Sequence, residues 1–395
     1  MESLIPFFII FAAGLVFSES FKRLHLPYVT ALILAGILIG PVFGWVAIDP
    51  IDPPIVFLGS IGVIFLMFIG GTEVKLKSLK SLEKDILFLV VLNSVIPFGV
   101  GFSLGWLFTG GLFVESAILG IVFISSSIAV IIPSLEVNNM IETKLGRTIV
   151  TSCVFEDLGS LLLFSVVLQT FGNQQSIFPL PIYLITVVLL VVALKIFVPR
   201  IQKLYYSDKK GEDLFESKVR FIFLVLIATV VMFEVLGMHA IIAGFIIGII
   251  LGDSITDKVE HKIRTISYGI FIPIFFLEMG LDIERSFLSS EHALFLTFVI
   301  IVGLFVSKVL SGWFAGKLLK FSNRDSWLIG FSTTPQLSTT LAAAVAATEA
   351  GLLSKELQTA LVFLAISTTF IAPLAIKFIS PDTPEKKERK SKLER

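Results

Sequence analysis

Long apolar runs separated by short polar segments dominate the sequence. A helix needs roughly 20 apolar residues to cross about 30 Å of hydrocarbon, and it satisfies its own backbone polar groups there. The runs predict about thirteen such spans, at residues 4–21, 29–47, 55–71, 86–108, 115–135, 146–171, 179–199, 218–236, 239–252, 266–281, 292–316, 325–350 and 357–379. The pattern therefore predicts an all-α polytopic membrane protein, in which the span from residue 239 is short enough to merge with its neighbour or to be partly re-entrant.

Basic residues gather in alternate loops between these spans. Lysine and arginine concentrate in cytoplasmic loops of membrane proteins, so the alternation predicts the orientation. The basic positions are Lys22 and Arg23, Lys75, Lys77, Lys80 and Lys84, Lys144 and Arg147, Arg200 to Arg220, Lys258, Lys262 and Arg264, Lys317, Lys320 and Arg324, and the tail. Arg285 and Lys355 are the exceptions in the other loops. We expect the N-terminus outside and the C-terminus in the cytoplasm, across the inner (plasma) membrane.

Composition agrees with a bilayer environment and excludes several function classes. Hydrophobic residues make up 55% of the 395 positions and charged residues 16%, against about 25% charged in soluble domains. The formal net charge is zero, so nucleic acid is not an expected partner. Cys153 is the single cysteine, which excludes an intrachain disulfide. The sequence shows no metal-ligand cluster and no hydrolase triad, so we expect neither a cofactor nor an enzyme.

The last fifteen residues differ from the rest. Residues 381–395 are dense in lysine, arginine and glutamate and too polar to bury a core, so this basic tail is expected to be disordered or to lie against anionic lipid. The transporter domain is therefore expected over residues 1–380.

Three motifs recur at an offset of about 209 residues. Ala-Gly-Ile-Leu-Ile-Gly at residues 35–40 returns as Ala-Gly-Phe-Ile-Ile-Gly at 243–248, the segment 68–73 resembles 278–282, and 118–120 resembles 328–330. Individually, such glycines are explained by close packing of membrane helices. Together they indicate a duplication, and because the offset spans seven helices, the second copy is expected upside down. Inverted repeats of this kind place a substrate site at their interface.

Two spans are polar where lipid-facing helices are not, at equivalent positions of the two repeats. The first contains Ser-Ser-Ser at residues 125–127, and the second contains Ser-Thr-Thr-Pro-Gln-Leu-Ser-Thr-Thr at 332–340. Hydroxyl groups and exposed carbonyls of an interrupted helix can bind a cation. The alternative is that these hydroxyls bond back to their own helices. The first reading makes candidates of Ser126, Ser127, Gln336, Ser338 and Thr339.

Glu156 and Asp157 lie well inside an apolar run. A charge at mid-membrane costs at least ~2.5–3.5 kcal/mol, so an acid there is a candidate functional residue. Desolvation favours the neutral form of a carboxyl group, which lets a proton and a cation compete for it. Adjacent helical residues project about 100° apart, so one acid can face the ion while the other meets a base. Lys308, also deep in a span, is the candidate base, and the alternative is an ion pair that only fixes packing.

Other polar positions are weaker candidates. Glu278 is near the outer end of its span, where it lines a water-filled entrance or is simply solvated. Glu234 and His239 flank a turn at Gly237 and are expected at the membrane interface. Asn93 is a lone polar residue in a span, for which a packing hydrogen bond is expected.

The motifs together resemble the cation:proton antiporter-2 family, over nearly the whole chain. They are Leu-Pro at 26–27, the two Ala-Gly repeats, Leu-Met-Phe-Ile-Gly at 66–70, Leu-Gly-Arg at 145–147 before Phe-Glu-Asp at 155–157, and Phe-Ile-Pro-Ile-Phe-Phe at 271–276. The resemblance implies thirteen helices and a homodimer. It also implies a dimerisation part at about 1–85 and 218–285, a moving core at about 86–172 and 292–380, and two crossing interrupted helices.

The resemblance also assigns roles to residues. Asp157 matches the ion-binding aspartate of the family, Glu156 the variable position before it, and Lys308 the core lysine. Glutamate at 156 leaves the stoichiometry open, although its acidity favours electrogenic exchange. Many relatives have Arg-Gly where Thr-Pro-Gln-Leu stands at 334–337, so the charge which that arginine neutralises is handled differently here.

We therefore expect a secondary antiporter that exchanges Na⁺, or else K⁺ or Li⁺, for H⁺ by an elevator-like motion, with the cation bound at Asp157. The alternatives are a K⁺/H⁺ antiporter or a Kef-type, channel-like potassium efflux protein, and a membrane sensor or enzyme on the same scaffold. Whether Glu278 and Gln336 line the ion path is left open at this stage.

Overall fold

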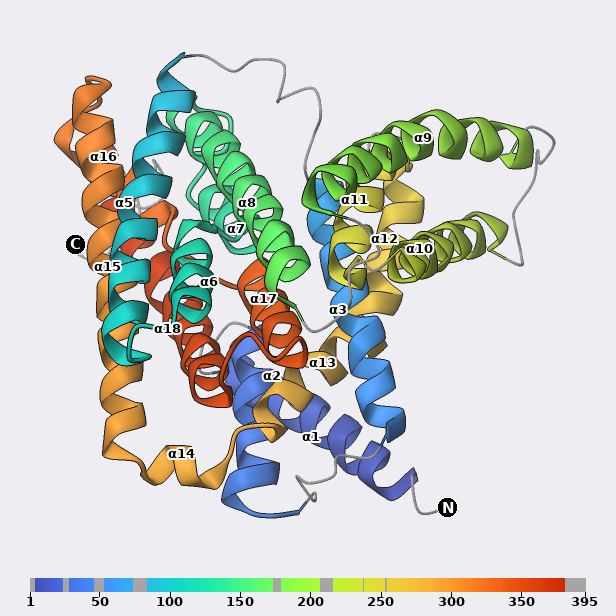
Figure 1. Ribbon diagram of the computed structural model, residues 1–395, viewed down its shortest axis with the longest axis horizontal. Coiled ribbons are helices and arrows are strands. Elements are labelled where there is room, and N and C mark those ends of the chain that lie inside the picture. The colour runs from blue at the N-terminus through green and yellow to red at the C-terminus, as the bar shows by residue number, and fades with distance from the viewer. Residues whose placement is uncertain are drawn as a thin grey trace, which may run out of the picture. The chain divides into compact units, whose positions relative to one another are not determined.

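The computed structural model describes residues 4–23, 28–45, 53–73, 84–172, 179–206, 216–236, 238–252 and 254–380. Throughout these ranges the regular structure is helical, with no strand (Figure 1). Some features of the sequence lie outside the described residues, namely the Leu-Pro pair at 26–27, the lysines at 75, 77 and 80, Gly237 and the basic tail 381–395.

Each of the thirteen expected spans is a helix or a set of consecutive helices. In chain order these are α1 (Leu4–Arg23), α2 (Tyr28–Ile37) with η1 (Leu38–Val42), α3 (Pro53–Glu73), α5 (Lys84–Phe108), α6 (Phe113–Ile124) with α7 (Ile128–Val137), α8 (Lys144–Phe171), α9 (Leu180–Tyr206), α10 (Ser217–Val235), α11 (Ala240–Gly252), α12 (Asp257–Ile266) with η2 (Ser267–Phe271) and α13 (Ile272–Leu281), α15 (Glu291–Leu318), α16 (Asn323–Ser332) with α17 (Ser338–Glu349), and α18 (Lys355–Ile379). Eight segments are long and apolar enough to cross a membrane, and three described helical segments are shorter but apolar. The chain is a polytopic helical membrane protein.

Two differences from the expected spans have a physical reason. The span expected from residue 266 begins earlier, at α12, whose charged face hid it from an apolar count while Val259 and Ile263 are buried. Arg264 of α12 bonds Glu260 at 3.0 Å and Glu73 at 3.1 Å, which satisfies its charge. The short helix α14 (Arg285–Ser289) was not expected.

The chain divides into two compact units. Unit 1 consists of Met1–Lys77, Phe164–Leu294 and Ala342–Thr359, and unit 2 of Ser78–Leu163, Phe295–Leu341 and Ala360–Arg395. The expected assignment of a dimerisation part and a moving core to segments of the chain stays a prediction.

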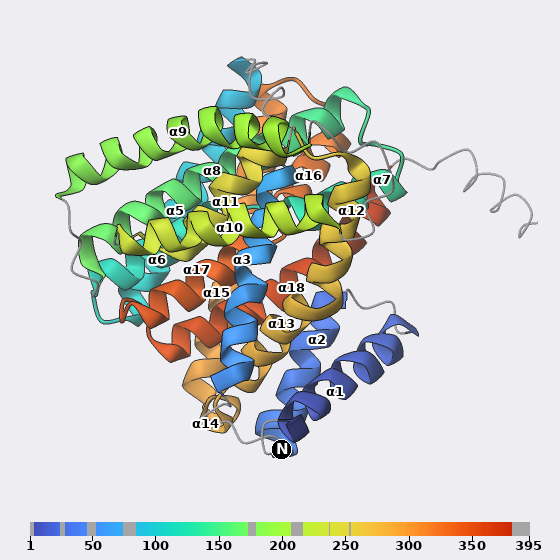
Figure 2. The same ribbon diagram turned by 90° about the vertical axis from the view of Figure 1, so that its right-hand side faces the viewer.

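Within unit 1, pairs of glycines bring helices into close contact. A Cβ atom on Gly36 of α2 would lie 2.9 Å from the Cα atom of Gly280 in α13, and a Cβ atom on Gly71 of α3 would lie 3.0 Å from the Cα atom of Gly248 in α11. Each contact joins a helix of one repeat to a helix of the other. The two contacts are equivalent, because α2 corresponds to α11 and α3 to α13. Figure 2 shows α1 beside α2 in the same unit.

Within unit 2, close contacts between glycines also join two equivalent helix pairs. A Cβ atom on Gly101 of α5 would lie 3.0 Å from the Cα atom of Gly120 in α6, and one on Gly312 of α15 would lie 2.7 Å from the Cα atom of Gly330 in α16. The inverted repeat is therefore visible in packing as well as in sequence, and it places the interrupted pairs α6–α7 and α16–α17 at corresponding positions.

Candidate functional site

Two helices of unit 2 are interrupted at the polar segments that the sequence singles out. Helix α6 ends at Ile124 and α7 begins at Ile128, while α16 ends at Ser332 and α17 begins at Ser338. Ser125 and Ser127 have extended backbones, with ψ of 154° and 107°. We call residues 125–127 the first break and residues 333–337 the second break.

The two breaks are hydrogen-bonded to each other. The backbone N–H of Ser127 donates to the Pro335 carbonyl at 2.7 Å, and the side-chain amide of Gln336 donates to the Ser125 carbonyl at 2.6 Å. The Gln336 N–H donates to the Thr368 hydroxyl at 3.0 Å, and its side-chain oxygen accepts from Thr340. Backbone groups released by each interruption are thus satisfied across the crossing, as burial requires. Carbonyls at the breaks were expected to face a cation, whereas those of Pro335 and Ser125 each accept a hydrogen bond.

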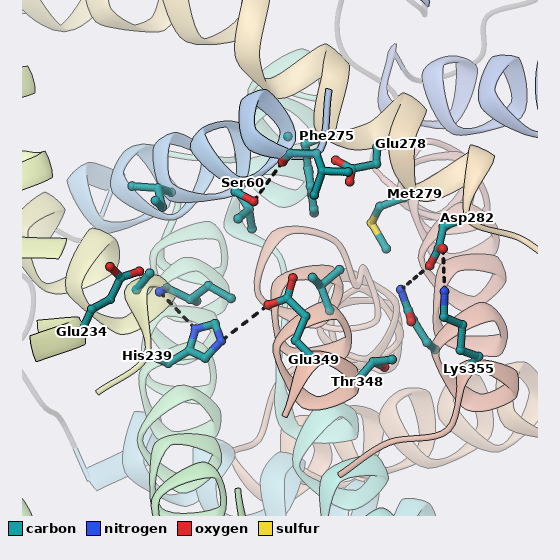
Figure 3. A pocket seen from close by; sticks show the side chains of 18 of the residues that line it. Ser60, Glu234, His239, Phe275, Glu278, Met279, Asp282, Thr348, Glu349 and Lys355 are labelled. Atoms are coloured by element: carbon teal, nitrogen blue, oxygen red, sulfur yellow. Dashed lines mark hydrogen bonds and ion pairs between the residues drawn. The ribbon is translucent and has the colours of Figure 1, made fainter. Parts of the chain in front are cut away.

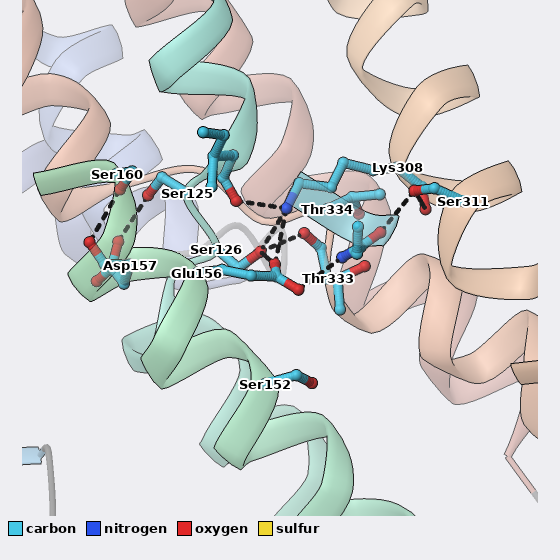
Figure 4. A network of polar contacts seen from close by, with 12 residues as sticks. Ser125, Ser126, Ser152, Glu156, Asp157, Ser160, Lys308, Ser311, Thr333 and Thr334 are labelled. Carbon is cyan, nitrogen blue, oxygen red and sulfur yellow. Dashed lines mark hydrogen bonds and ion pairs between the residues drawn. The ribbon is translucent and has the colours of Figure 1, made fainter. Parts of the chain in front are cut away.

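Glu156 of α8 is completely buried and ion-paired with Lys308 of α15 (Figure 4). The Lys308 ammonium lies 2.7 Å from Glu156 Oε2, and the Ser126 hydroxyl lies 2.7 Å from the same oxygen. Glu156 Oε1 accepts from the Asn93 amide at 2.9 Å. Lys308 also donates to the Ile124 carbonyl at 2.5 Å, so the pair is attached to the end of α6.

Asn93 and Ser311 complete this network. The Ser311 hydroxyl donates to Asn93 Oδ1 at 2.6 Å, which fixes the orientation in which the Asn93 amide nitrogen faces Glu156. The Asn93 hydrogen bond agrees with the packing role expected for it. Ser311 was missed by the sequence analysis, although its position one helical turn after Lys308 could have suggested it.

Asp157 has different partners from its neighbour. Its Oδ1 atom accepts from the Ser125 hydroxyl at 2.6 Å, and the Thr339 hydroxyl is a second hydrogen-bond partner. Asp157 is 4% exposed, and among the described residues no basic side chain lies within ion-pair distance of it. Asp157 is therefore a buried carboxyl whose direct hydrogen-bond partners are the hydroxyls of Ser125 and Thr339.

The remaining predicted residues lie at the breaks, with different neighbours from those expected. The Ser126 hydroxyl lies 2.7 Å from both Glu156 Oε2 and the Thr333 carbonyl oxygen, and its one proton is donated to one of them at a time. The Ser127 hydroxyl is buried without a partner, and Ser338 is buried as the first residue of α17. Ser125, the hydroxyl that bonds Asp157, was not among the predicted ion ligands. Glu234, His239 and Glu278 belong to unit 1.

The chain is similar to known proteins over nearly its whole length. Residues 7–380 match the family described as sodium/hydrogen exchanger, transmembrane. The chain is 30% identical to a probable Na(+)/H(+) antiporter 3 of Methanocaldococcus jannaschii over 94% of this chain and 95% of that protein. It is 26% identical to a Na(+)/H(+) antiporter of Enterococcus hirae, over 94% and 96%. The structure of the sodium proton antiporter MjNhaP1 from M. jannaschii superposes with a TM-score of 0.69 at 17% identity, over 95% of this chain and 96% of that one, which shows a shared fold.

Proposed function

Because the chain belongs to the family of transmembrane sodium/hydrogen exchangers, we propose that it exchanges a monovalent cation, sodium first, for protons at Asp157. The observation that carries this proposal is the state of Asp157, a buried carboxyl beside the crossing of two broken helices with hydroxyl partners and no basic one. A proton or a sodium ion neutralises such a group equally well. The two ions therefore compete for one site, as exchange requires.

The environment of Asp157 explains how binding couples to movement. An uncompensated charge at mid-membrane is costly, so the empty, ionised carboxyl opposes any change of access that keeps it dehydrated. With either ion bound, that penalty falls. The hydroxyls of Ser125 and Thr339 can donate to the ionised carboxyl or turn a lone pair towards a cation, so both states keep partners. The protein therefore changes access readily only when a proton or a cation is bound to Asp157. This condition couples the proton flux to the cation flux.

The Glu156–Lys308 pair lies beside the site, because Glu156 projects from α8 about 100° away from Asp157. Both charges are compensated and bonded to the first break through Ser126 and the Ile124 carbonyl. In this proposal the ion pair holds the first break in position beside Asp157. The alternative role for Lys308, a proton carrier released when sodium binds, predicts that Lys308→Met abolishes voltage generation and leaves electroneutral exchange.

Loop charges and family membership support a proposal for how the protein is arranged in the membrane. We propose a homodimer in the inner (plasma) membrane, with the N-terminus outside and an elevator-like motion of the part that carries Asp157. The alternation of basic loops supports the orientation. The inverted repeat supports alternating access.

Replacement of Asp157 tests the function directly. In proteoliposomes we expect Asp157→Asn to abolish sodium-driven proton flux, because asparagine keeps the volume but exchanges no proton. Asp325→Asn, at the exposed start of α16 in the same unit, should retain flux. Coupled flux in Asp157→Asn would refute the site, and cation flux in the unaltered protein without any pH dependence would favour the channel-like alternative. Parallel runs with potassium and lithium rank the cations.

A further inference from the structure

Unit 1 contains a cavity of about 640 Å³ that is rich in carboxylates (Figure 3). Every residue that lines it belongs to unit 1. The walls come from the first half of α3, the end of α10, the start of α11, the end of α13, the end of α17 and the start of α18. The loops that adjoin these walls are those that the basic-residue pattern places outside. At about 30 Å³ for each water, the cavity has room for a hydrated ion.

The charges around the cavity are unbalanced. The acidic side chains that line it are Glu234, Glu278, Asp282 and Glu349, and the lysine is Lys355. Lys355 lies 2.6 Å from Asp282, so that acid is already paired. His239 Nε2 lies 3.9 Å from Glu349, whose side chain is largely exposed. Among the described residues, neither Glu234 nor Glu278 has a basic side chain within ion-pair distance.

The Glu278 carboxyl group lies directly against the backbone of α3 at Gly59. A Cβ atom on Gly59 of α3 would lie only 1.7 Å from Glu278 Oε2, so the carboxylate occupies the space that any other residue at 59 would fill. Asp282 and Glu349 are the charged groups that act on it. The glycine thus lets the end of this flexible side chain of α13 lie against α3, and a methyl group at position 59 would move it.

A second, independent feature of the same cavity is an amide oxygen without a partner. Gln358 lines the cavity at 7% exposure, and its Nε2 atom faces Asp282 at 3.4 Å. Its Oε1 atom is buried and accepts no hydrogen bond from the residues that the structure describes. A buried acceptor left unsatisfied is costly, so a water molecule or an ion is expected to satisfy it. Amide and carboxylate oxygens are the donor atoms that hard cations prefer.

We propose that this cavity is a second cation site, which binds a hydrated monovalent cation through Glu278, Glu349 and Gln358, separately from Asp157. A divalent ion is disfavoured, because no three acidic, histidine or cysteine side chains converge to hold a metal among the described residues. The site lies at the end of unit 1 that the loop charges place outside, so its occupant comes from the external medium.

The test measures binding without transport. Purified Asp157→Asn protein in detergent is incubated with ²²Na⁺ in a scintillation proximity assay. Unlabelled sodium chloride displaces the specifically bound ²²Na⁺, and choline chloride replaces it in the reference sample. We expect saturable ²²Na⁺ binding that persists without the aspartate. In the same background, Glu278→Gln and Gly59→Ala should reduce binding to the non-displaceable level, the first by removing the carboxylate and the second by displacing it.

Controls keep the result interpretable. Gly269→Ala is the matched control for Gly59→Ala, because a Cβ atom there meets nothing within 4 Å, and it should bind as the Asp157→Asn parent does. Glu349→Gln alters a largely exposed side chain and provides a second variant should Glu278→Gln fail to fold. Absence of ²²Na⁺ binding in Asp157→Asn, or binding unchanged by Glu278→Gln and Gly59→Ala, overturns the proposal. Coupled flux in the unaltered protein is measured separately, so failure of the exchange function is distinguishable from failure of this site.

Discussion

Glu156 and Asp157 show how adjacent residues of one helix acquire different chemistry. They project about 100° apart, and that rotation aims one at Lys308 and Asn93 and the other at Ser125. Glu156 lies within hydrogen-bond distance of the Lys308 ammonium, the Asn93 amide and the Ser126 hydroxyl, so its charge is compensated. Asp157 has hydroxyl partners, which can form hydrogen bonds with both the ionised and the neutral carboxyl group.

The ion pair predicts a strong non-additivity in stability. Glu156→Gln or Lys308→Met should each lower the free energy of unfolding by about 3–5 kcal/mol, because the surviving charge is buried without compensation. Replacing both should recover much of that loss. Thermal unfolding of the two single variants and the double variant in detergent gives the coupling energy.

Simple addition of the two single losses would show that the side chains do not interact. Proton flux measured on the same preparations separates the two roles of the pair. Exchange retained by the double variant assigns the pair to structure and the ion chemistry to Asp157 alone.

Ser125→Ala should weaken sodium binding and leave turnover largely intact. The variant removes the hydroxyl that lies 2.6 Å from Asp157. A hydrogen bond to a charged group contributes about 1.5 kcal/mol at least, which corresponds to roughly a tenfold rise in the apparent KM for sodium. Ser134→Ala is the control, because that hydroxyl bonds only the Val130 carbonyl of its own helix. An unchanged KM would remove Ser125 from the site.

At the scale of helices, the sequence predicted the fold closely. Apolar length located every span, and the paired hydroxyl-rich segments indicated both interruptions. The charged helix α12 was not predicted as part of a span, because its buried side is formed by two apolar residues, Val259 and Ile263, and the rest of its surface is polar. Its arginine is satisfied by Glu73, about 190 residues earlier, and such a partner is not visible in a local pattern.

The site was predictable in its charged residues and less so in its neutral ones. A carboxylate or an ammonium group in a span is conspicuous because of its cost, so Glu156, Asp157 and Lys308 were identified. Which of three consecutive serines faces which acid depends on the path of the break, and sequence does not specify that path. Ser125 and Ser311 were missed for this reason.

The glycine contacts predict effects of opposite sign for the same substitution. Gly312→Ala places a methyl group 2.7 Å from the Gly330 Cα atom and should lower the free energy of unfolding by about 1–3 kcal/mol through overpacking. Gly99→Ala in α5 meets nothing within 4 Å and should gain up to ~1 kcal/mol from helix propensity. Thermal unfolding in detergent measures both, and equal effects would contradict the close approach of α15 and α16.

At the scale of the whole molecule, exposed apolar surface agrees with a lipid environment. Helix α9 is the clearest case, since only 11% of its most apolar window is buried and Ile185, Val188 and Leu189 are exposed. In water such a helix would aggregate. Lipid, or a second copy of the chain as proposed above, covers it without cost.

The orientation is testable because the single native thiol is inaccessible. Cys153 is fully buried, so it gives little background with an impermeant maleimide. Ser289→Cys should be labelled in intact cells, and Asn323→Cys only after permeabilisation, because the loop charges place α14 outside and the start of α16 inside. The reverse pattern would invert the topology.

The bonding between the two breaks has a consequence for the ancestry of the protein. Ser127 of one repeat bonds Pro335 of the other, and Gln336 bonds Ser125 in return. A single repeat would leave these groups buried and unsatisfied, so neither half is self-sufficient. Before duplication, a half-length chain could have closed this crossing only by meeting a second copy inserted in the membrane the opposite way up. Gene fusion then joined in one chain two copies that had previously met only when they were inserted in opposite orientations.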